Sequence, residues 1–251
     1  MEARKELNQE FAIQKQNIGP VPGNIVERYV RVAEGYAEVE NVLAVLSILD
    51  RNESFVVHGK FSDCICIDKE KCSGRISSIW EDEIFKAVHQ DDLEMKMMQE
   101  LLFLHYVNRQ SRQHRFDKYL MQRLRMRGKD GGWVDTLHRL YYIPAEDGKS
   151  IRFALCLYGV LTANLKPQSV VMDTLTGEQT LLDNTVGKKI LSRQEVEVLK
   201  LIDNGNRSQG IAELLKISIH TVSRHRQNII AKLKVRNSVE ACKIARNLSL
   251  I

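Results

Sequence analysis

The hydrophobic and polar positions of this chain follow two periods, which divide it into a mixed front part and a helical end. Val42 to Asp50 and Ser54 to Lys60 are short apolar segments joined by a turn, as expected for two paired strands. Between Tyr119 and Arg127 the side chains alternate between a basic side and a mostly apolar side, which is the period of a strand. Two further segments, Trp133 to Ile143 and Ile151 to Leu161, each follow a glycine-containing turn and predict a meander.

Helical spacing occurs before and between these strands. Residues 24–40 predict an amphipathic helix that either packs on its own domain or mediates dimerisation. The apolar positions of this stripe are Ile25, Tyr29, Val32 and Tyr36. A second helix is predicted over residues 93–108, with Asp91 or Asp92 as its N-cap. The front part is therefore predicted to be α+β, with a five-stranded antiparallel sheet and helices on one side of it.

The last sixty or so residues contain consecutive helix starts and a different pattern. Ser192 and Glu195 form a capping box for a first helix, and Ser208 is placed to cap a second one. Lys216 and Ile217 make a short turn, after which Ser218 caps a third helix that runs to about residue 234. Two helices joined by such a turn form a helix-turn-helix, whose second helix usually enters the DNA major groove. A last helix is predicted to begin at Ser238.

The faces of the third of these helices follow from ~100° of rotation per residue. Val222, Ile229 and Leu233 fall together and predict a buried seam. The side chains that point away from this seam, and are free to reach base edges, are those of Arg224, Gln227, Asn228 and Ala231. The flanking stripe, suited to phosphate contacts, holds Thr221, His225 and Lys232. An amphipathic surface helix with a solvated face is the simpler alternative.

Charge is distributed unevenly along the chain. Residues 188–251 hold 13 Lys and Arg against 5 Asp and Glu, a net charge of +8, whereas the remainder of the chain carries −3. Phosphate neutralisation requires such a concentration of positive charge at a DNA-binding end. This distribution favours the nucleic-acid interpretation of the helical end over that of a solvated surface helix.

The helical end resembles the LuxR-type helix-turn-helix of bacterial transcription regulators. The matching positions before the turn are Leu191, Ser192, Glu195, Val198, Leu199, Leu201, Ile202, Gly205, Ile211, Ala212 and Leu214. The matching positions after it are Ser218, Thr221, Val222, His225, Asn228, Ile229, Lys232 and Leu233. The resemblance implies an all-α domain of four helices in which Ser223, Arg224 and Gln227 read bases. It also implies phosphate contacts by Thr221, His225 and Lys232, to which we add Asn228, and dimerisation on DNA through the last helix.

Two residues depart from the family pattern. Gln194 stands where the family usually has Arg, and Gly210 stands where it usually has Glu. Glycine inside a helix costs about 1 kcal/mol relative to alanine. The first two helices of the domain are therefore expected to be less rigid than is usual in the family, and firm DNA binding to depend on dimerisation.

The front part resembles a PAS domain, most clearly in two short segments. His89, Asp91 and Asp92 precede the second predicted helix, and the segment from Arg127 to Val134 joins two strands through a glycine-rich turn. In the family these residues fix helix and hairpin geometry and are not catalytic. The resemblance implies a sensory or dimerising domain, with a small molecule as its possible ligand. An unrelated α+β sensor fold remains the alternative.

The cysteines raise a second functional hypothesis. Cys64, Cys66 and Cys72 lie close together in the sequence, and His58 or His89 would have to supply a fourth metal ligand. A metal- or thiol-dependent redox sensor or enzyme centred on residues 58–89 is thus the alternative function. The spacing lacks the paired C-x₂-C of structural zinc sites, and no nucleophile–base pair is evident. We therefore predict no metal, no cofactor and no enzymatic activity.

The sequence predicts four segments: an N-terminal helical segment (1–40), a PAS-like domain (41–163), a connector (164–187) and the helix-turn-helix domain (188–251). Within the connector, residues 169–174 and 178–182 predict a small hairpin. The expected partners are double-stranded DNA, a second copy of the chain and RNA polymerase. Neither a signal peptide nor a membrane span is apparent, and the odd number of cysteines fits a reducing cytosol, so we expect a cytoplasmic protein.

Overall fold

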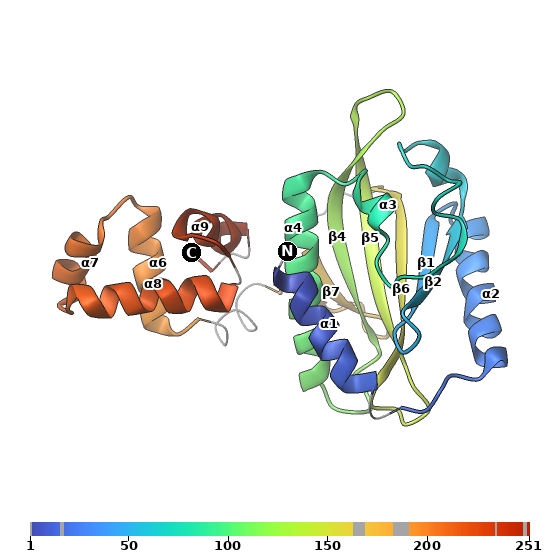
Figure 1. Ribbon diagram of the computed structural model, residues 1–251, viewed down its shortest axis with the longest axis horizontal. Helices are drawn as coiled ribbons and strands as arrows, with labels where there is room; N and C mark the ends of the chain where they lie inside the picture. Colours follow the sequence, from blue (N-terminus) through green and yellow to red (C-terminus); the bar gives the residue numbers. More distant parts are fainter. Residues whose placement is uncertain (1, 16–17, 163–168, 183–190, 234, 248–249) are drawn as a thin grey trace. The chain divides into compact units, whose positions relative to one another are not determined.

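The computed structural model divides the chain into two compact units, Ala3–Thr180 and Leu181–Ile251. The structure describes residues 2–15, 18–162, 169–182, 191–233, 235–247 and 250–251 (Figure 1). The predicted connector therefore lies partly outside the described residues, at 164–168 and 183–187.

The front unit is built on one antiparallel sheet of eight strands in the order β3-β2-β1-β6-β5-β4-β7-β8. The central strands are β1 (Leu43–Ile48), β2 (Glu53–His58), β4 (Lys118–Arg127), β5 (Trp133–Pro144) and β6 (Ile151–Val160). The edge strands are β3 (Gly74–Ile76), β7 (Ser169–Asp173) and β8 (Gln179–Thr180). All five predicted strands are present and adjacent, so the mixed helix and antiparallel-sheet class is confirmed.

The predicted number of strands was too low, because three short strands extend the sheet at its edges. β3 pairs with β2, and the predicted hairpin of the connector forms β7 and β8, of which β7 pairs with β4. β3 contains three residues and follows an irregular segment, so it lacks the alternation that identifies a strand. The sequence predicted the hairpin itself, and the structure adds it to the sheet through β7.

Helices cover both faces of the sheet, and not one face as predicted. The helices of this unit are α1 (Glu2–Lys15), α2 (Gly23–Val39), α3 (Asp82–Phe85) and α4 (Gln90–Arg109). Val26, Ala33 and Ala37 of α2 pack against alternate residues of β1 and β6, such as Leu46 and Leu155. The opposite face meets α4, and Figure 1 shows α1 on that side as well. β1 and β6 are therefore buried on both faces, which explains their almost continuous apolar sequences.

The start of α4 differs in detail from the sequence prediction. His89 is its N-cap, because its Nδ1 accepts a hydrogen bond from the backbone N–H of Asp91 at 3.2 Å. Asp92 is buried instead, and its carboxylate accepts hydrogen bonds from the backbone and the guanidinium of Arg125 in β4. The predicted cap by Asp91 or Asp92 is thus wrong, and Asp92 fastens the helix to the sheet.

The C-terminal unit is a small all-α domain. Its described helices are α6 (Arg193–Asp203), α7 (Ser208–Leu215), α8 (Ile219–Leu233) and α9 (Ser238–Asn247). Their shared core is apolar and fully or almost fully buried, and consists of Val198, Leu199, Ile211, Val222, Ile229, Leu233, Ala241 and Ala245. The four predicted helices are therefore all present. No helix in the described part of the chain has the length and hydrophobicity that crossing a bilayer requires.

Candidate nucleic-acid interface

The helix α8 is placed by the turn that precedes it. Lys216 adopts a left-handed conformation (φ 53°), and the N–H of Ile217 donates back to the carbonyl of Ala212 at 3.0 Å, which ends α7. Ser218 then accepts a hydrogen bond from the N–H of Thr221 at 3.0 Å and caps α8, as predicted. This turn fixes the angle between the two helices.

The buried seam of α8 lies where the sequence placed it. Val222, Ile229 and Leu233 are 0%, 1% and 0% exposed, so this face is fixed in the domain core. Ser223, Arg224 and Gln227, the candidate base-reading residues, are all exposed, as is Asn228. The seam therefore leaves one polar, positively charged face of the helix open to a partner.

The candidate phosphate-contacting residues have different surroundings. Thr221 and His225 are half-buried at the flank of α8, and the Thr221 hydroxyl lies 2.8 Å from that of Ser218. Within the described residues, Nδ1 of His225 is buried and has no hydrogen-bond partner. The Thr221 hydroxyl and the His225 ring are thus held close to the helix surface, whereas Asn228 is exposed.

Lys232 has an internal partner that sequence reasoning missed. Its Nζ donates to both oxygens of Glu195, at 2.9 and 2.7 Å. Glu195 is buried and also completes the predicted capping box, because its side chain accepts from the Ser192 N–H and its own N–H donates to the Ser192 hydroxyl. Burial alone would raise the pKa of Glu195, but the hydrogen bonds from Lys232 and Ser192 outweigh it and lower that pKa. The ammonium group of Lys232 therefore has an ion-pair partner within the domain.

The first helix of the helix-turn-helix starts one residue earlier than predicted. Arg207 is the N-cap of α7 and makes no side-chain cap bond, so the predicted cap by Ser208 is wrong. The hydroxyl of Ser208 instead accepts from Nη1 of Arg226 in α8 at 3.0 Å. Arg226 thereby links α7 and α8. The two residues are 18 positions apart, so a local sequence pattern does not predict this contact.

The last helix, α9, is capped by the residue before its predicted start. Asn237 Oδ1 accepts from the N–H groups of Val239 and Glu240, at 3.0 and 2.9 Å. The small residues Ala241 and Ala245 are 0% exposed and are used by the domain core. Val239, in contrast, is 78% exposed. Ala241 and Ala245 are therefore not available to a second copy, whereas Val239 is.

The front unit contains a cluster of buried polar side chains between α4 and the sheet. Lys96 and Glu100 of α4 form an ion pair of 2.6 Å with side chains 1% and 7% exposed. Burial opposes the charge of Lys96, but Glu100 and Glu81 outweigh it and raise the pKa of Lys96. Burial raises the pKa of Glu81, although Lys96 lies near it. A cavity of about 30 Å³ adjoins this cluster, and Leu7 and Phe11 of α1 line its other side.

The cysteine-rich segment does not assemble the predicted alternative site. Cys64 and Cys66 are exposed and Cys72 is buried. Both ring nitrogens of His58 are engaged, by the Ser62 hydroxyl at 3.0 Å and the Cys72 carbonyl at 2.8 Å. Among the described residues, the group of His, Cys and carboxylate side chains with metal-ligand spacing is a different one, Glu100, His138 and Cys156.

These features define a helix-turn-helix domain whose second helix, α8, exposes a polar face that includes Arg224. Residues 189–245 match the family model described as bacterial regulatory proteins, luxR family. The C-terminal segment is therefore a LuxR-type helix-turn-helix domain. Over 63 residues the chain is 38% identical to the oxygen regulatory protein NreC of Staphylococcus epidermidis and, equally, to that of Staphylococcus aureus. The match covers 25% of this chain and 29% of each relative, so the chain spans under a third of their length.

The chain also aligns with solved structures, at low sequence identity and low TM-score. A VqmA dimer of Vibrio cholerae, described as a LuxR-type receptor, is 15% identical and covers 86% of both chains with a TM-score of 0.30. The PAS-B domain of Cycle from Drosophila melanogaster is 13% identical and covers 47% of this chain and 99% of its own, with a TM-score of 0.31. Superpositions at this level are too loose to support an inference about function.

Proposed function

We propose that this protein is a DNA-binding transcription regulator that reads its site with α8 and is controlled by its PAS-like front unit. The observation that carries the proposal is the exposure of Ser223, Arg224 and Gln227 on the face of α8 opposite its buried seam. The match of residues 189–245 to the luxR family supports the same conclusion. Arg224 is the proposed guanine reader, because arginine bonds O6 and N7 of guanine bidentately.

Phosphate contacts are proposed for the flank of α8. Thr221, His225 and Asn228 lie beside the base-reading face and offer hydroxyl, imidazole and amide donors. Lys232 was predicted to join them, but its ion pair with Glu195 leaves it a minor role in our proposal. These contacts would fix the register on the duplex without contributing sequence preference.

A homodimer is the proposed active form. Two copies related by a two-fold axis would place two α8 helices in adjacent major grooves and bind a palindrome. The exposed side of α9 around Val239 is the proposed contact on DNA. RNA polymerase is the further partner that a transcription regulator of this kind is expected to contact.

The front unit is proposed to respond to a small molecule. An open groove of about 540 Å³ lies where β1 begins and β6 ends. Phe61, Arg139 and Val160 are among its lining residues. Its volume falls in the usual range of ligand sites, of about 300–1,000 Å³. The interior cavity of about 30 Å³ is too small for an organic ligand.

The test is a selection from a library of random double-stranded DNA with the full-length protein. The proposal predicts enrichment of a palindrome with half-sites about 10 bp apart from centre to centre. Binding to the enriched DNA should weaken steeply with added salt, because phosphate contacts release counterions. Failure to enrich any sequence, with a protein shown to be folded by circular dichroism, would refute the proposal.

A further inference from the structure

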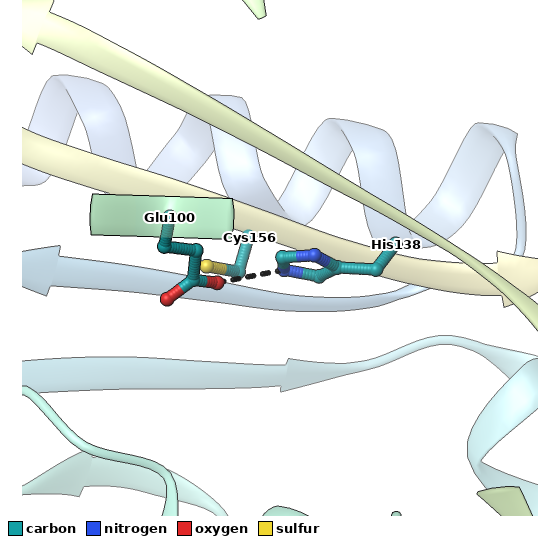
Figure 2. A group of neighbouring side chains, drawn as sticks. All are labelled: Glu100, His138 and Cys156. Carbon is teal, nitrogen blue, oxygen red and sulfur yellow. Dashed lines mark ion pairs between the residues drawn. The ribbon is translucent and has the colours of Figure 1, made fainter. Parts of the chain in front are cut away.

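Three side chains from separate elements meet inside the front unit. Glu100 lies on α4, His138 on β5 and Cys156 on β6, and all three are buried. Their potential ligand atoms, a carboxylate oxygen, a ring nitrogen and Sγ, lie within 4.8 Å of one another. Figure 2 shows the carboxylate and the sulfur gathered at one edge of the His138 ring. None of these residues has a part in the proposed DNA contacts.

The hydrogen bonds around His138 determine which ring nitrogen is free. The side-chain N–H of Gln122 donates to Gln99 at 2.7 Å, so the Gln122 carbonyl oxygen is the acceptor that faces His138. Nδ1 of His138, 2.7 Å away, therefore donates, and Nε2 carries the lone pair. Burial, with the charge of Lys96 next in importance, lowers the pKa of His138 well below its usual value, so the ring is neutral.

The free nitrogen of His138 points into the cluster and has no partner. Nε2 is buried and makes no hydrogen bond within the described structure. It lies 3.9 Å from Oε1 of Glu100, the contact drawn as a dashed line in Figure 2. A buried acceptor without a donor is costly, at about 1–3 kcal/mol. Metal-binding histidines have this arrangement, in which the second ring N–H donates to an oxygen that fixes the ring.

We propose that Glu100, His138 and Cys156 bind one divalent transition-metal ion of the zinc class. A thiolate with an imidazole and a carboxylate suits zinc, whereas magnesium and calcium prefer all-oxygen sites. Three protein ligands leave the fourth tetrahedral position open, as in zinc sites that hold a water. The cavity of about 30 Å³, lined by Glu100 and Cys156, has room for that water.

The surrounding charges match such an ion. Glu81 lies beside the Cys156 thiol and within electrostatic reach of Lys96. With an ion bound, two carboxylates and the Cys156 thiolate carry −3, and the ion with Lys96 carries +3. When the metal–sulfur bond forms, the S–H bond of Cys156 breaks and its proton is released to the solvent. In this structure Lys96 donates a hydrogen bond to Glu100. With the ion bound, its ammonium group would interact with the carboxylates of both Glu100 and Glu81.

Cobalt(II) titration of the full-length protein tests this site, because thiolate-bound cobalt has a charge-transfer absorption band in the near ultraviolet. The titration is done in a C64S/C66S background, which removes the two exposed thiols. We expect the band to saturate at one cobalt per chain and zinc to displace it. Cobalt binding requires no DNA, so a negative result here leaves the proposed function standing.

Variants made in that background assign the ligands. H138Q and C156S should each abolish the band, whereas C242S, which removes a buried thiol of the other unit, should keep it. A C64S/C66S/C72S/C242S variant retains Cys156 as its one thiol and should also keep the band, a test that leaves the site itself unaltered. The proposal is overturned if the folded C64S/C66S protein shows no band, or if the band persists in H138Q or C156S.

Discussion

Nζ of Lys232, near the end of α8, lies 2.7 Å from Oε2 of Glu195, in the first turn of α6. The same carboxylate completes the capping box of α6 with Ser192. One buried glutamate therefore contacts both the first turn of α6 and the end of α8. The exposed residues of α8 are presented on a helix that is anchored at its far end.

Replacing Lys232 with Met should destabilise the C-terminal unit. The substitution leaves the Glu195 carboxylate buried without its cation, and a lost hydrogen bond to a charged group costs about 1.5–3 kcal/mol. Because the Lys232 side chain is 42% exposed, solvent screening reduces the expected loss of unfolding free energy to about 1–2 kcal/mol. Urea unfolding of the full-length chain measures the change. The matched control is K200M, an exposed lysine of α6, and an equal loss in both variants would contradict this role of the ion pair.

The same carboxylate predicts a pH dependence. The pKa of Glu195 is lower in the folded chain than its ordinary value of 4.5, so the unfolded chain binds the proton more readily. The stabilisation is therefore complete above the ordinary glutamate range and is lost as the pH falls through the lowered pKa. Wild type and E195Q should differ in unfolding free energy at neutral pH and converge in acid. A constant difference over the whole range would show that the charge of Glu195 is not the cause.

Gly210 is predicted to destabilise α7. Packing around this position does not require a glycine. A Cβ at this position would have Asn206 Oδ1, 4.0 Å away, as its nearest neighbour, so alanine fits. G210A should raise the unfolding free energy by about 1 kcal/mol, which is the difference in helix propensity. Gly205 is the control, because its φ of 82° disfavours any side chain, and G205A should be destabilising. Thermal unfolding of both variants checks the opposite signs.

The buried pair of Lys96 and Glu100 should show strong coupling. K96M leaves a buried carboxylate unpaired, and breaking such a pair typically costs about 3–5 kcal/mol. The double variant K96M/E100L removes both charges and should be more stable than K96M alone. Unfolding in the presence of a chelator measures this, so that bound metal makes no contribution. Additive effects of the two substitutions would show that the charges do not interact.

Local sequence patterns were sufficient for the five central strands of the sheet, for the four helices of the C-terminal unit and for the faces of α8. The burial of Val222, Ile229 and Leu233 was predicted from their spacing alone, because the period of the helix determines which residues share a face. The Ser218 cap and the Ser192–Glu195 capping box were also predicted, since both join residues three positions apart. The base and phosphate roles assigned to α8 stay predictions.

Contacts between distant residues could not be predicted in this way. Asp92 was expected to cap a helix and instead binds Arg125, 33 positions away, and Lys232 meets Glu195 across 37 positions. Asp92 was assigned to a local cap and Lys232 to a phosphate contact, whereas tertiary packing gives each of them an ion-pair partner in another element. The cluster of Glu100, His138 and Cys156 depends on the register of β5 and β6 and has no local pattern at all.

The most direct test of the account is DNA binding by an Arg224→Ala variant. Binding is measured by fluorescence anisotropy on the selected palindrome and on a scrambled duplex, with R236A as a control that removes the same charge outside α8. We predict that R224A loses about 1–3 kcal/mol on the palindrome and much less on the scrambled duplex, with relaxed preference at one base of each half-site. R236A should shift both curves by a similar, smaller factor. If R224A moved both curves equally, or left the palindrome curve unchanged, α8 would not read sequence through Arg224.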